Sequence, residues 1–213
     1  MPISFGSHNI KEIVYGSQQI KEVYLGNQLV WRKAPAWFFE DDFERTTLGA
    51  NWNPASGALI SAGELKKNNS NGSSDNWTAM TFPTDDLHVV TTLGTVTDPA
   101  QRSSIVLGSP SQYVYCEFSK NGGIIGDYDG WAWSDRTTIP SLTIVNGSTV
   151  EVTRLGTTIR FIVNGVVRAT ATSSQGIGSS HRKVNLSVRR NSNIFGTYYS
   201  PTFEDVKIGK YTP

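Results

Sequence analysis

The chain has 213 residues, and its 19 Lys and Arg against 18 Asp and Glu leave a net charge of +1. This balance excludes an electrostatically driven nucleic-acid binder, and the charged fraction of 17% is too low for a coiled coil or a solvated disordered tail. The length allows one full domain with its own core plus a smaller piece. Because the longest apolar runs are far shorter than a membrane span of roughly 20 residues, we expect no membrane insertion.

The first 33 residues contain a ten-residue repeat. Residues 10–19 (IKEIVYGSQQ) and residues 20–29 (IKEVYLGNQL) are identical at five of ten positions. Each copy predicts one short strand that ends in a Gly-polar turn, and residues 30–31 predict a third strand. We interpret residues 1–33 as a small β-meander, followed by a linker at 34–37.

A sheet of two or three short strands is marginal in water, because it removes little apolar surface from solvent. This arm must therefore pack either on its own sandwich or on another subunit. In the second case it would assemble by strand addition, with backbone pairing and alternate apolar side chains. The residues that would carry this interface are Ile10, Ile13, Ile20, Val23, Leu25, Val30 and Trp31.

Residues 38–213 predict an all-β domain. Apolar periodicity of the helical kind is absent, and Gly, Pro, Asn and Ser interrupt the chain every 8–12 residues or so. The expected strands are 38–43, 79–82, 88–93, 103–107, 113–119, 131–134, 141–145, 150–154, 158–163, 166–171, 183–189 and 202–208. The clearest signal is Asn164-Gly165 between two β-branched runs, which is typical of a type I′ hairpin turn. Strands at this spacing indicate an antiparallel two-sheet jelly-roll sandwich.

Several sequence segments resemble those of known protein families. Residues 20–31 (IKEVYLGNQLVW) resemble the N-terminal segment of minor tail proteins from phages of actinobacteria. Residues 41–45 (DDFER), with LG at 48–49 and NW at 51–52, resemble the opening strand of concanavalin A-like domains in such proteins. The three-strand meander at 149–171, with VTRLG at 152–156 and FIVNG at 161–165, is similar to the late strands of laminin-G-like and lectin-like jelly rolls. Residues 203–209 (FEDVKIG) resemble the closing strand that pairs beside the opening strand.

This resemblance implies a structural component of a phage tail tip, anchored by its arm and presenting a lectin-like domain to host cell-surface glycan. The implied partners are other tail subunits, further copies of the chain in a homo-oligomer, and host cell-wall glycan. Cys116 is the one cysteine, so no internal disulfide can form, and the start lacks the features of a secretory signal. We therefore expect assembly in the reducing cytoplasm of the host bacterium and localisation in the virion tail.

The spacing Glu40-x-Asp42-x-Glu44 resembles the active-site strand of laminarinase-type glycosidases, which share the jelly roll. On one strand these carboxylates would share a face, and a pair about 5–5.5 Å apart could perform retaining hydrolysis. However, the motif lies on the opening edge strand, and Asp41 stands where those enzymes have an apolar residue. We expect a solvated strand and no catalytic residues, so that the protein is not an enzyme.

The cluster at residues 127–135 (DYDGWAWSD) is the candidate binding site. If the segment is extended, Trp131, Trp133 and Asp129 share one face. Flat indole rings beside carboxylates suit a sugar, whose C–H face stacks on the ring while its hydroxyls bond to acids. The interpretation we adopt is a glycan-binding set of Trp131, Trp133, Asp129 and Asp127. The alternative is that both tryptophans fill the core.

A calcium site near Asp127, Asp129 and Asp135 is the weaker possibility, because the order of residues departs from a calcium loop. We expect no metal and no cofactor. Two alternatives to the tail protein stay open. One is a self-contained carbohydrate-binding module, and the other is a glycoside hydrolase of the laminarinase-like type.

Overall fold

A computed structural model of the chain describes residues 37–54 and 57–212, together with six short strands within the first 36 residues. Residues 1–36 and 37–213 form two separate compact units. The described strands of the first unit pair as hairpins: β1 (Ser4–Phe5) with β2 (His8–Asn9), β3 (Ile13–Tyr15) with β4 (Gln18–Ile20), and β5 (Glu22–Leu25) with β6 (Gln28–Arg32).

The repeat of the first unit corresponds to the last two of these hairpins. In each, two short strands flank a Gly-polar pair, at residues 16–17 and at residues 26–27. Ile13 lies opposite Ile20 in the first hairpin, and Val23 lies opposite Trp31 in the second. Ile10 lies outside the described residues. The role of these apolar residues in assembly stays a prediction.

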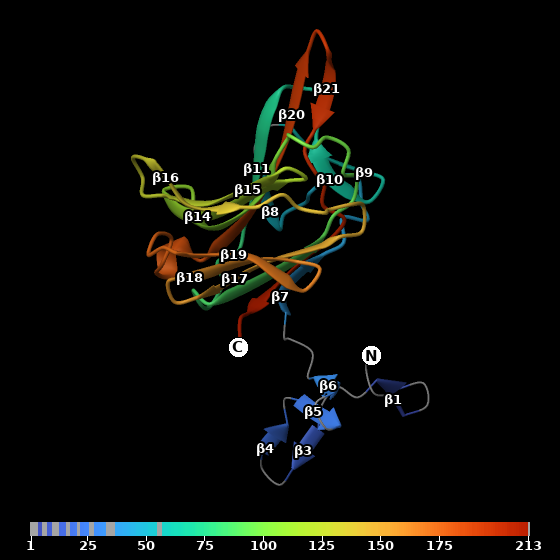
Figure 1. The fold of residues 1–213 in the computed structure, drawn as a ribbon, viewed down its shortest axis with the longest axis vertical. Helices are drawn as coiled ribbons and strands as arrows, with labels where there is room; N and C mark the ends of the chain where they lie inside the picture. Colours follow the sequence, from blue (N-terminus) through green and yellow to red (C-terminus); the bar gives the residue numbers. More distant parts are fainter. Residues whose placement is uncertain are drawn as a thin grey trace. The chain divides into compact units, whose positions relative to one another are not determined.

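The second unit is a sandwich of two antiparallel sheets, which confirms the predicted fold class (Figure 1). The eight-stranded sheet runs β16 (Trp133–Ile139), β15 (Gly122–Tyr128), β14 (Gln112–Ser119), β13 (Ser103–Ser109), β20 (Lys183–Asn193), β11 (Gly72–Thr78) and β8 (Trp52–Pro54), with β21 (Gly196–Tyr199) paired to the end of β20. The six-stranded sheet runs β19 (Val166–Thr172), β18 (Thr158–Val163), β17 (Thr149–Leu155), β12 (Leu87–Thr92), β22 (Val206–Lys210) and β7 (Trp37–Asp41).

The core fills the space between the two sheets. Its fully buried aromatic residues include Phe118, Phe161 and Phe203, whose rings are in contact. A short hairpin of β9 (Ala58–Ser61) and β10 (Glu64–Lys67) and one 3-10 turn, Ser179–His181, complete the described elements. Within the described part of the chain, no helix is long and apolar enough to cross a membrane.

The predicted type I′ hairpin is confirmed. The two central residues between β18 and β19, Asn164 and Gly165, have φ angles of 49° and 76°. The closing strand also behaves as the resemblance implied, because β22 pairs with β7 along the edge of the six-stranded sheet.

The prediction of a strand at 79–82 is wrong, and the strand before it, β11, was missed. The inward-facing residues of β11 are Ser74, Asn76 and Thr78, and all three are fully buried. Asn76 donates from its amide to the carbonyls of Ser74 and Leu186, so the chain satisfies a buried polar group inside the sheet. Hydrophobic alternation cannot identify a strand whose inner face is polar.

The expected strand at 141–145 is also absent, although its side chains alternate as predicted. Leu142 and Ile144 are buried in the core. The backbone of this segment joins no ladder, and the amide of Leu142 donates to the carbonyl of Lys120. Alternation shows which side chains face the core, and strand pairing needs a neighbouring chain as well.

The opening strand ends in a hydrogen-bonded network centred on Asp41. The Arg45 guanidinium donates two hydrogen bonds of 2.5 Å to the Asp41 carboxylate, and the Trp52 indole donates one of 2.7 Å. Phe43 has a φ of 52° and donates its amide to the same carboxylate, which ends the strand. The residues at 41–52 that carried the family resemblance are therefore one interacting unit.

Because of this network, the stability of the fold depends on pH. Burial alone would raise the pKa of Asp41, but the hydrogen bonds from Arg45, Trp52 and Phe43 outweigh it and lower the pKa below its ordinary 3.8. A lowered folded-state pKa means that ionised Asp41 stabilises the fold above the ordinary value. This contribution is lost as the pH falls through the lowered pKa.

We predict that Asp41→Asn lowers the unfolding free energy by about 1–3 kcal/mol near neutral pH, because it weakens a buried charged acceptor. Urea unfolding should show this difference shrinking as the pH falls below the ordinary value of 3.8 and through the lowered pKa of Asp41, because Asp41 itself then becomes protonated. Asp42→Asn, at an exposed neighbour, is the control and should change stability far less. If the loss of unfolding free energy in Asp41→Asn stays constant from neutral pH to strong acid, Asp41 is not the group whose ionisation stabilises the fold.

Candidate functional site

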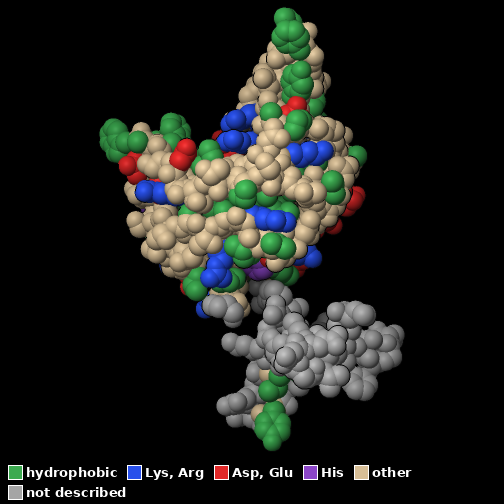
Figure 2. Space-filling view, in the orientation of Figure 1, with side chains coloured by type: hydrophobic (Ala, Val, Ile, Leu, Met, Phe, Trp, Pro, Cys, Tyr) green, Lys and Arg blue, Asp and Glu red, His purple; other side chains and the backbone are tan. Residues whose placement is uncertain are grey.

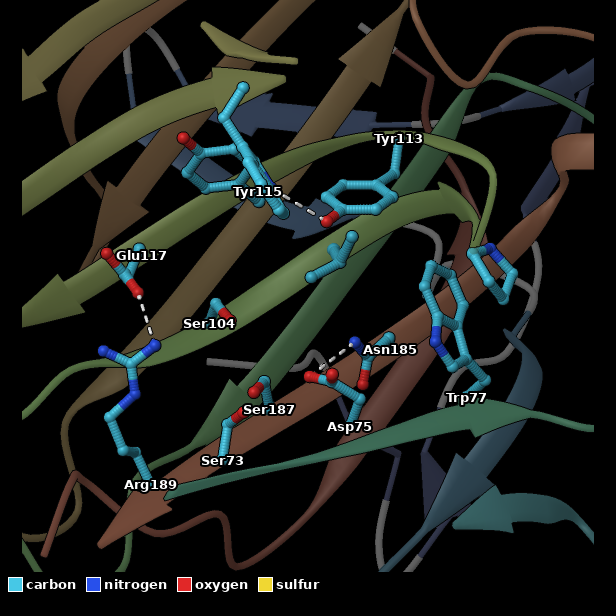
Figure 3. A pocket seen from close by; sticks show the side chains of 13 residues that line it. Ser73, Asp75, Trp77, Ser104, Tyr113, Tyr115, Glu117, Asn185, Ser187 and Arg189 are labelled. Carbon is cyan, nitrogen blue, oxygen red and sulfur yellow. Dashed lines mark hydrogen bonds and ion pairs between the residues drawn. The ribbon is translucent and has the colours of Figure 1, made fainter. Parts of the chain in front are cut away.

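A hollow of about 390 Å³ lies on the outer face of the eight-stranded sheet, within the usual size range of small-ligand sites (Figure 3). Its lining comes from strands β11, β13, β14, β16 and β20 and from the turn after β13. The residues that line it are Ser73, Asp75, Trp77, Ser104, Val106, Pro110, Tyr113, Tyr115, Glu117, Trp133, Asn185, Ser187 and Arg189.

The alternation of the strands explains why these residues face outward. On β14, Cys116 and Phe118 point into the core, while Tyr115 and Glu117 point into the hollow. Strands β13, β20 and β11 alternate in the same way. Strands β13, β14 and β20 thus supply mostly apolar residues to the core, whereas β11 supplies buried polar ones. All four strands present mostly polar or aromatic residues to the hollow.

The register of the strands aligns the outward residues in rows across the sheet. One row is Tyr115, Val106, Asn185 and Trp77, and the next row is Glu117, Ser104, Ser187 and Asp75. The first row has an aromatic ring at each end, and the second has a carboxylate at each end with two hydroxyls between them.

Five aromatic rings border the site in a connected series. The rings of Trp133 and Tyr128 lie 4.9 Å apart, and those of Tyr128 and Tyr113 lie 5.2 Å apart. Tyr113 is 6.3 Å from Tyr115 and 6.2 Å from Trp77. The Trp133 indole donates a 3.1 Å hydrogen bond to the Tyr113 hydroxyl, which fixes an exposed ring in place. The result is an ordered aromatic surface that is accessible to a ligand.

The Tyr115 ring lies over Gly126 of β15. A Cβ added at Gly126 would lie 2.4 Å from the Tyr115 hydroxyl oxygen, so this glycine makes room for the ring. The hydroxyl donates a 3.2 Å hydrogen bond to Asp135. Burial raises the pKa of Tyr115, and burial also raises the pKa of Tyr113. Both phenols therefore keep their protons near neutral pH.

The charged groups of the hollow have partners already. Arg102 and Arg189 approach the two oxygens of Glu117 at 3.2 Å and 3.5 Å, and Figure 3 shows the contact between Arg189 and Glu117. Asp75 accepts a 3.4 Å hydrogen bond from the Asn185 amide. Since two strands separate Glu117 from Asp75 in their row, their backbones are about 14 Å apart.

The structure separates the four residues of the sequence-predicted site. Trp133 lines the hollow. Trp131 lies in the turn after β15 and is 93% exposed. Asp129 is also in this turn, where its carboxylate accepts the amides of Trp131 and Ala132 at 2.8 Å and 2.9 Å. These backbone hydrogen bonds lower the pKa of Asp129.

The Asp127 side chain points to the face of β15 that is turned away from the hollow, and it is 2% exposed. Its carboxylate accepts hydrogen bonds from Arg136 at 2.7 Å and from Ser173 at 2.5 Å. Arg136 belongs to the edge strand β16, and Ser173 follows β19 of the other sheet. Asp127 thus links the edge strand that carries Trp133 to the opposite sheet.

Sequence reasoning missed most of the hollow. Tyr113, Tyr115 and Glu117 were within a predicted strand, and their alternation with Val114 and Cys116 was the available signal. The members on β11 and β20 are Asp75, Trp77, Asn185 and Arg189. No sequence pattern indicates that strands so distant in the chain meet.

The spacing Glu40-x-Asp42-x-Glu44 does not form a strand face in the structure. Strand β7 ends at Asp41, and the Asp42 carboxylate accepts the amide of Glu44 in a turn. Glu40 lies 3.7 Å from the Lys207 ammonium on β22. These three acids are exposed at the edge of the six-stranded sheet, away from the hollow.

The three aspartates of the possible calcium site also diverge. Asp127 points inward, Asp129 holds its turn, and Asp135 accepts the Tyr115 hydroxyl. Among the residues that the structure describes, no group of three or more His, Cys, Asp or Glu is placed to hold a metal ion.

Comparisons with known proteins show the fold. No protein family model matches the chain. No curated protein sequence matches it either. Among solved structures, a protein of unknown function with a galectin-like fold from Bacillus subtilis has 10% identity and a TM-score of 0.64, covering 84% of this chain and 97% of that one.

Two further solved structures belong to proteins named for carbohydrates. The Bacillus licheniformis beta-glucanase has 14% identity and a TM-score of 0.57, covering 81% of this chain and 98% of that one. The carbohydrate recognition domain of Emp47p has 14% identity and a TM-score of 0.57, covering 81% and 94% of the two chains.

We predict that replacing each of the two aspartates near the β15–β16 turn by alanine lowers the unfolding free energy by a different amount. Asp127→Ala removes a buried acceptor with two partners and should lower the unfolding free energy by about 2–3 kcal/mol. Asp129→Ala removes two exposed hydrogen bonds within the turn and should lower the unfolding free energy far less. Urea unfolding measures both, and equal costs for the two variants would argue against the linking role of Asp127.

The fold established by this geometry and these likenesses is a concanavalin A-like jelly roll, an architecture shared by glucanases and carbohydrate recognition domains.

Proposed function

We propose that the hollow on the eight-stranded sheet binds a neutral glycan without cleaving it. The observation that carries this proposal is the aromatic surface of Trp133, Tyr128 and Tyr113 beside rows of hydroxyl, amide and carboxylate groups. A sugar ring presents C–H faces that stack on aromatic rings and hydroxyls that bond to polar side chains. The likeness in fold to a glucanase and a carbohydrate recognition domain supports this function.

The charges of the site favour an uncharged glycan. Arg189, the cation that lines the hollow, is already paired with Glu117. An acidic sugar would have to compete with that carboxylate. The serines at 73, 104 and 187 and the Asn185 amide instead suit the hydroxyls of a neutral sugar.

The absence of catalysis is part of the proposal. The two carboxylates of the hollow, on Asp75 and Glu117, lie in strands separated by two others. A pair that acts as acid and base, or as acid and nucleophile, must reach both sides of one glycosidic bond. The glycoside-hydrolase alternative has less support from this spacing.

We predict that Trp133→Ala weakens binding to a neutral polysaccharide at least about tenfold, because a stacked ring contributes on the order of 1–2 kcal/mol. The measurement is retardation in gels that contain β-glucan, galactan, mannan or arabinan. Trp131→Ala is the matched control, since Trp131 is exposed but outside the hollow, and it should bind as the natural chain does.

Retardation by none of these polymers, or equal loss in both tryptophan variants, would contradict the site. Incubation of the protein with the polysaccharide that it binds should release no reducing ends. Release that disappears in Glu117→Gln or Asp75→Asn would favour the hydrolase instead.

The tail-component interpretation is a second candidate. It is supported by the repeated hairpins of residues 1–36, which form a compact unit separate from the sandwich. In this proposal the arm anchors the protein to other subunits of a phage tail, and the sandwich meets host glycan.

The solution mass should distinguish these roles. If the arm is an assembly element, light scattering will find a discrete oligomer for the full chain and a folded monomer for residues 37–213. Two stable monomers would count against self-assembly through the arm and leave glycan binding as the main activity.

A further inference from the structure

Two hairpins project from the sandwich, and each carries large apolar side chains at its tip (Figures 1 and 2). The turn between β20 and β21 consists of Ile194 and Phe195, which are 92% and 82% exposed. The turn between β15 and β16 carries Trp131, which is 93% exposed. Hairpin tips are normally occupied by polar residues and glycine, so these three side chains need an explanation.

The turns themselves do not require apolar residues. The Asn193 side chain accepts the amide of Phe195 at 2.8 Å, and Gly196 follows. The Asp129 side chain holds the amides of Trp131 and Ala132 in the other hairpin. In both hairpins a polar side chain and a glycine shape the turn, so the apolar side chains are free to serve another purpose.

The two tips lie on either side of the hollow. Trp133 from β16 and Arg189 from β20 both line it, so the hollow lies between the two hairpins. In Figure 1 a plane seen edge-on can touch both tips without meeting the rest of the sandwich. A flat partner can therefore reach both tips at once, and it would lie across the mouth of the hollow.

We propose that this side of the sandwich docks on the surface of a lipid bilayer, with Ile194, Phe195 and Trp131 inserted at its interface. A bilayer offers apolar interior behind a continuous plane, which both tips can reach together. A protein partner would need two separate pockets at a matching distance. Such peripheral contact needs no membrane-spanning segment and is compatible with the short apolar runs of the sequence.

The residues next to the tip of the β20–β21 hairpin suit the headgroup and phosphate regions of a bilayer. Tyr198 lies against Gly196, next to the tip, where the amphipathic ring of tyrosine suits the headgroup region. Arg190 is four residues from Ile194, about 13 Å along the strand. With a tip inserted by about 5–10 Å, Arg190 lies near the phosphates.

Arg190 is available to meet a lipid phosphate. Its guanidinium donates to the neutral side chains of Asn71 and Tyr199, at 2.7 Å and 3.2 Å. The charged residues between 189 and 199 are both arginines. We therefore expect a preference for anionic lipid at this hairpin.

The test is flotation of the full chain with vesicles of phosphatidylcholine and with vesicles of an equimolar mixture of phosphatidylcholine and phosphatidylglycerol. We expect binding to both, and tighter binding to the mixture. Ile194→Ser with Phe195→Ser should reduce binding about tenfold or more, and Trp131→Ser should reduce it by a smaller factor. Arg190→Gln should remove the preference for the mixture.

The matched control is Val166→Ser with Val167→Ser. This pair is also apolar, each residue 50% exposed, and it follows the β18–β19 turn of the six-stranded sheet. The control should float as the natural chain does. Failure of the full chain to float with either vesicle, unchanged flotation of the Ile194 and Phe195 double variant, or an equal loss in the control would each overturn the proposal. Because these vesicles contain no sugar, the result is independent of glycan binding.

Discussion

The alternation of side chains along the central strands is the constraint on which the rest of the structure depends. In β13, β14 and β20, successive residues must point to opposite faces of the sheet. One face has to be apolar because it packs against the six-stranded sheet. The other face is then free to vary in composition without loss of the core, and in this chain it carries aromatic rings, hydroxyls, amides and paired charges.

The register between strands turns this free face into a site. Asp75, Ser187, Ser104 and Glu117 come from four strands, and antiparallel pairing alone brings them into one row. The aromatic rings are ordered by contacts among themselves and by the hydrogen bond from Trp133 to Tyr113. A ligand would therefore meet a surface that is already organised, which lowers the entropic cost of binding.

The sequence was sufficient for the fold class but not for the site. Apolar alternation and the Asn164-Gly165 turn identify the late strands, because these signals depend on neighbours in the chain. Strand β11 escaped detection because Ser74, Asn76 and Thr78 are buried polar residues. Trp133 was identified from its local cluster, yet Trp77 and Asn185 join it only through long-range pairing. The extended conformation assumed for residues 127–135 also failed, since Asp129 closes a turn and Asp127 points inward.

We propose that the outer face of the eight-stranded sheet is the glycan-binding surface. Its most direct test is an NMR titration of the chain, carrying ¹³C-labelled tyrosine rings, with an oligosaccharide of whichever polysaccharide it binds. If this face binds the ligand, the ring signals of Tyr113, Tyr115 and Tyr128 shift on binding, while those of Tyr15 and Tyr211 stay in place. Shifts confined to Tyr15 or Tyr211 would place the ligand elsewhere and contradict this assignment of the site.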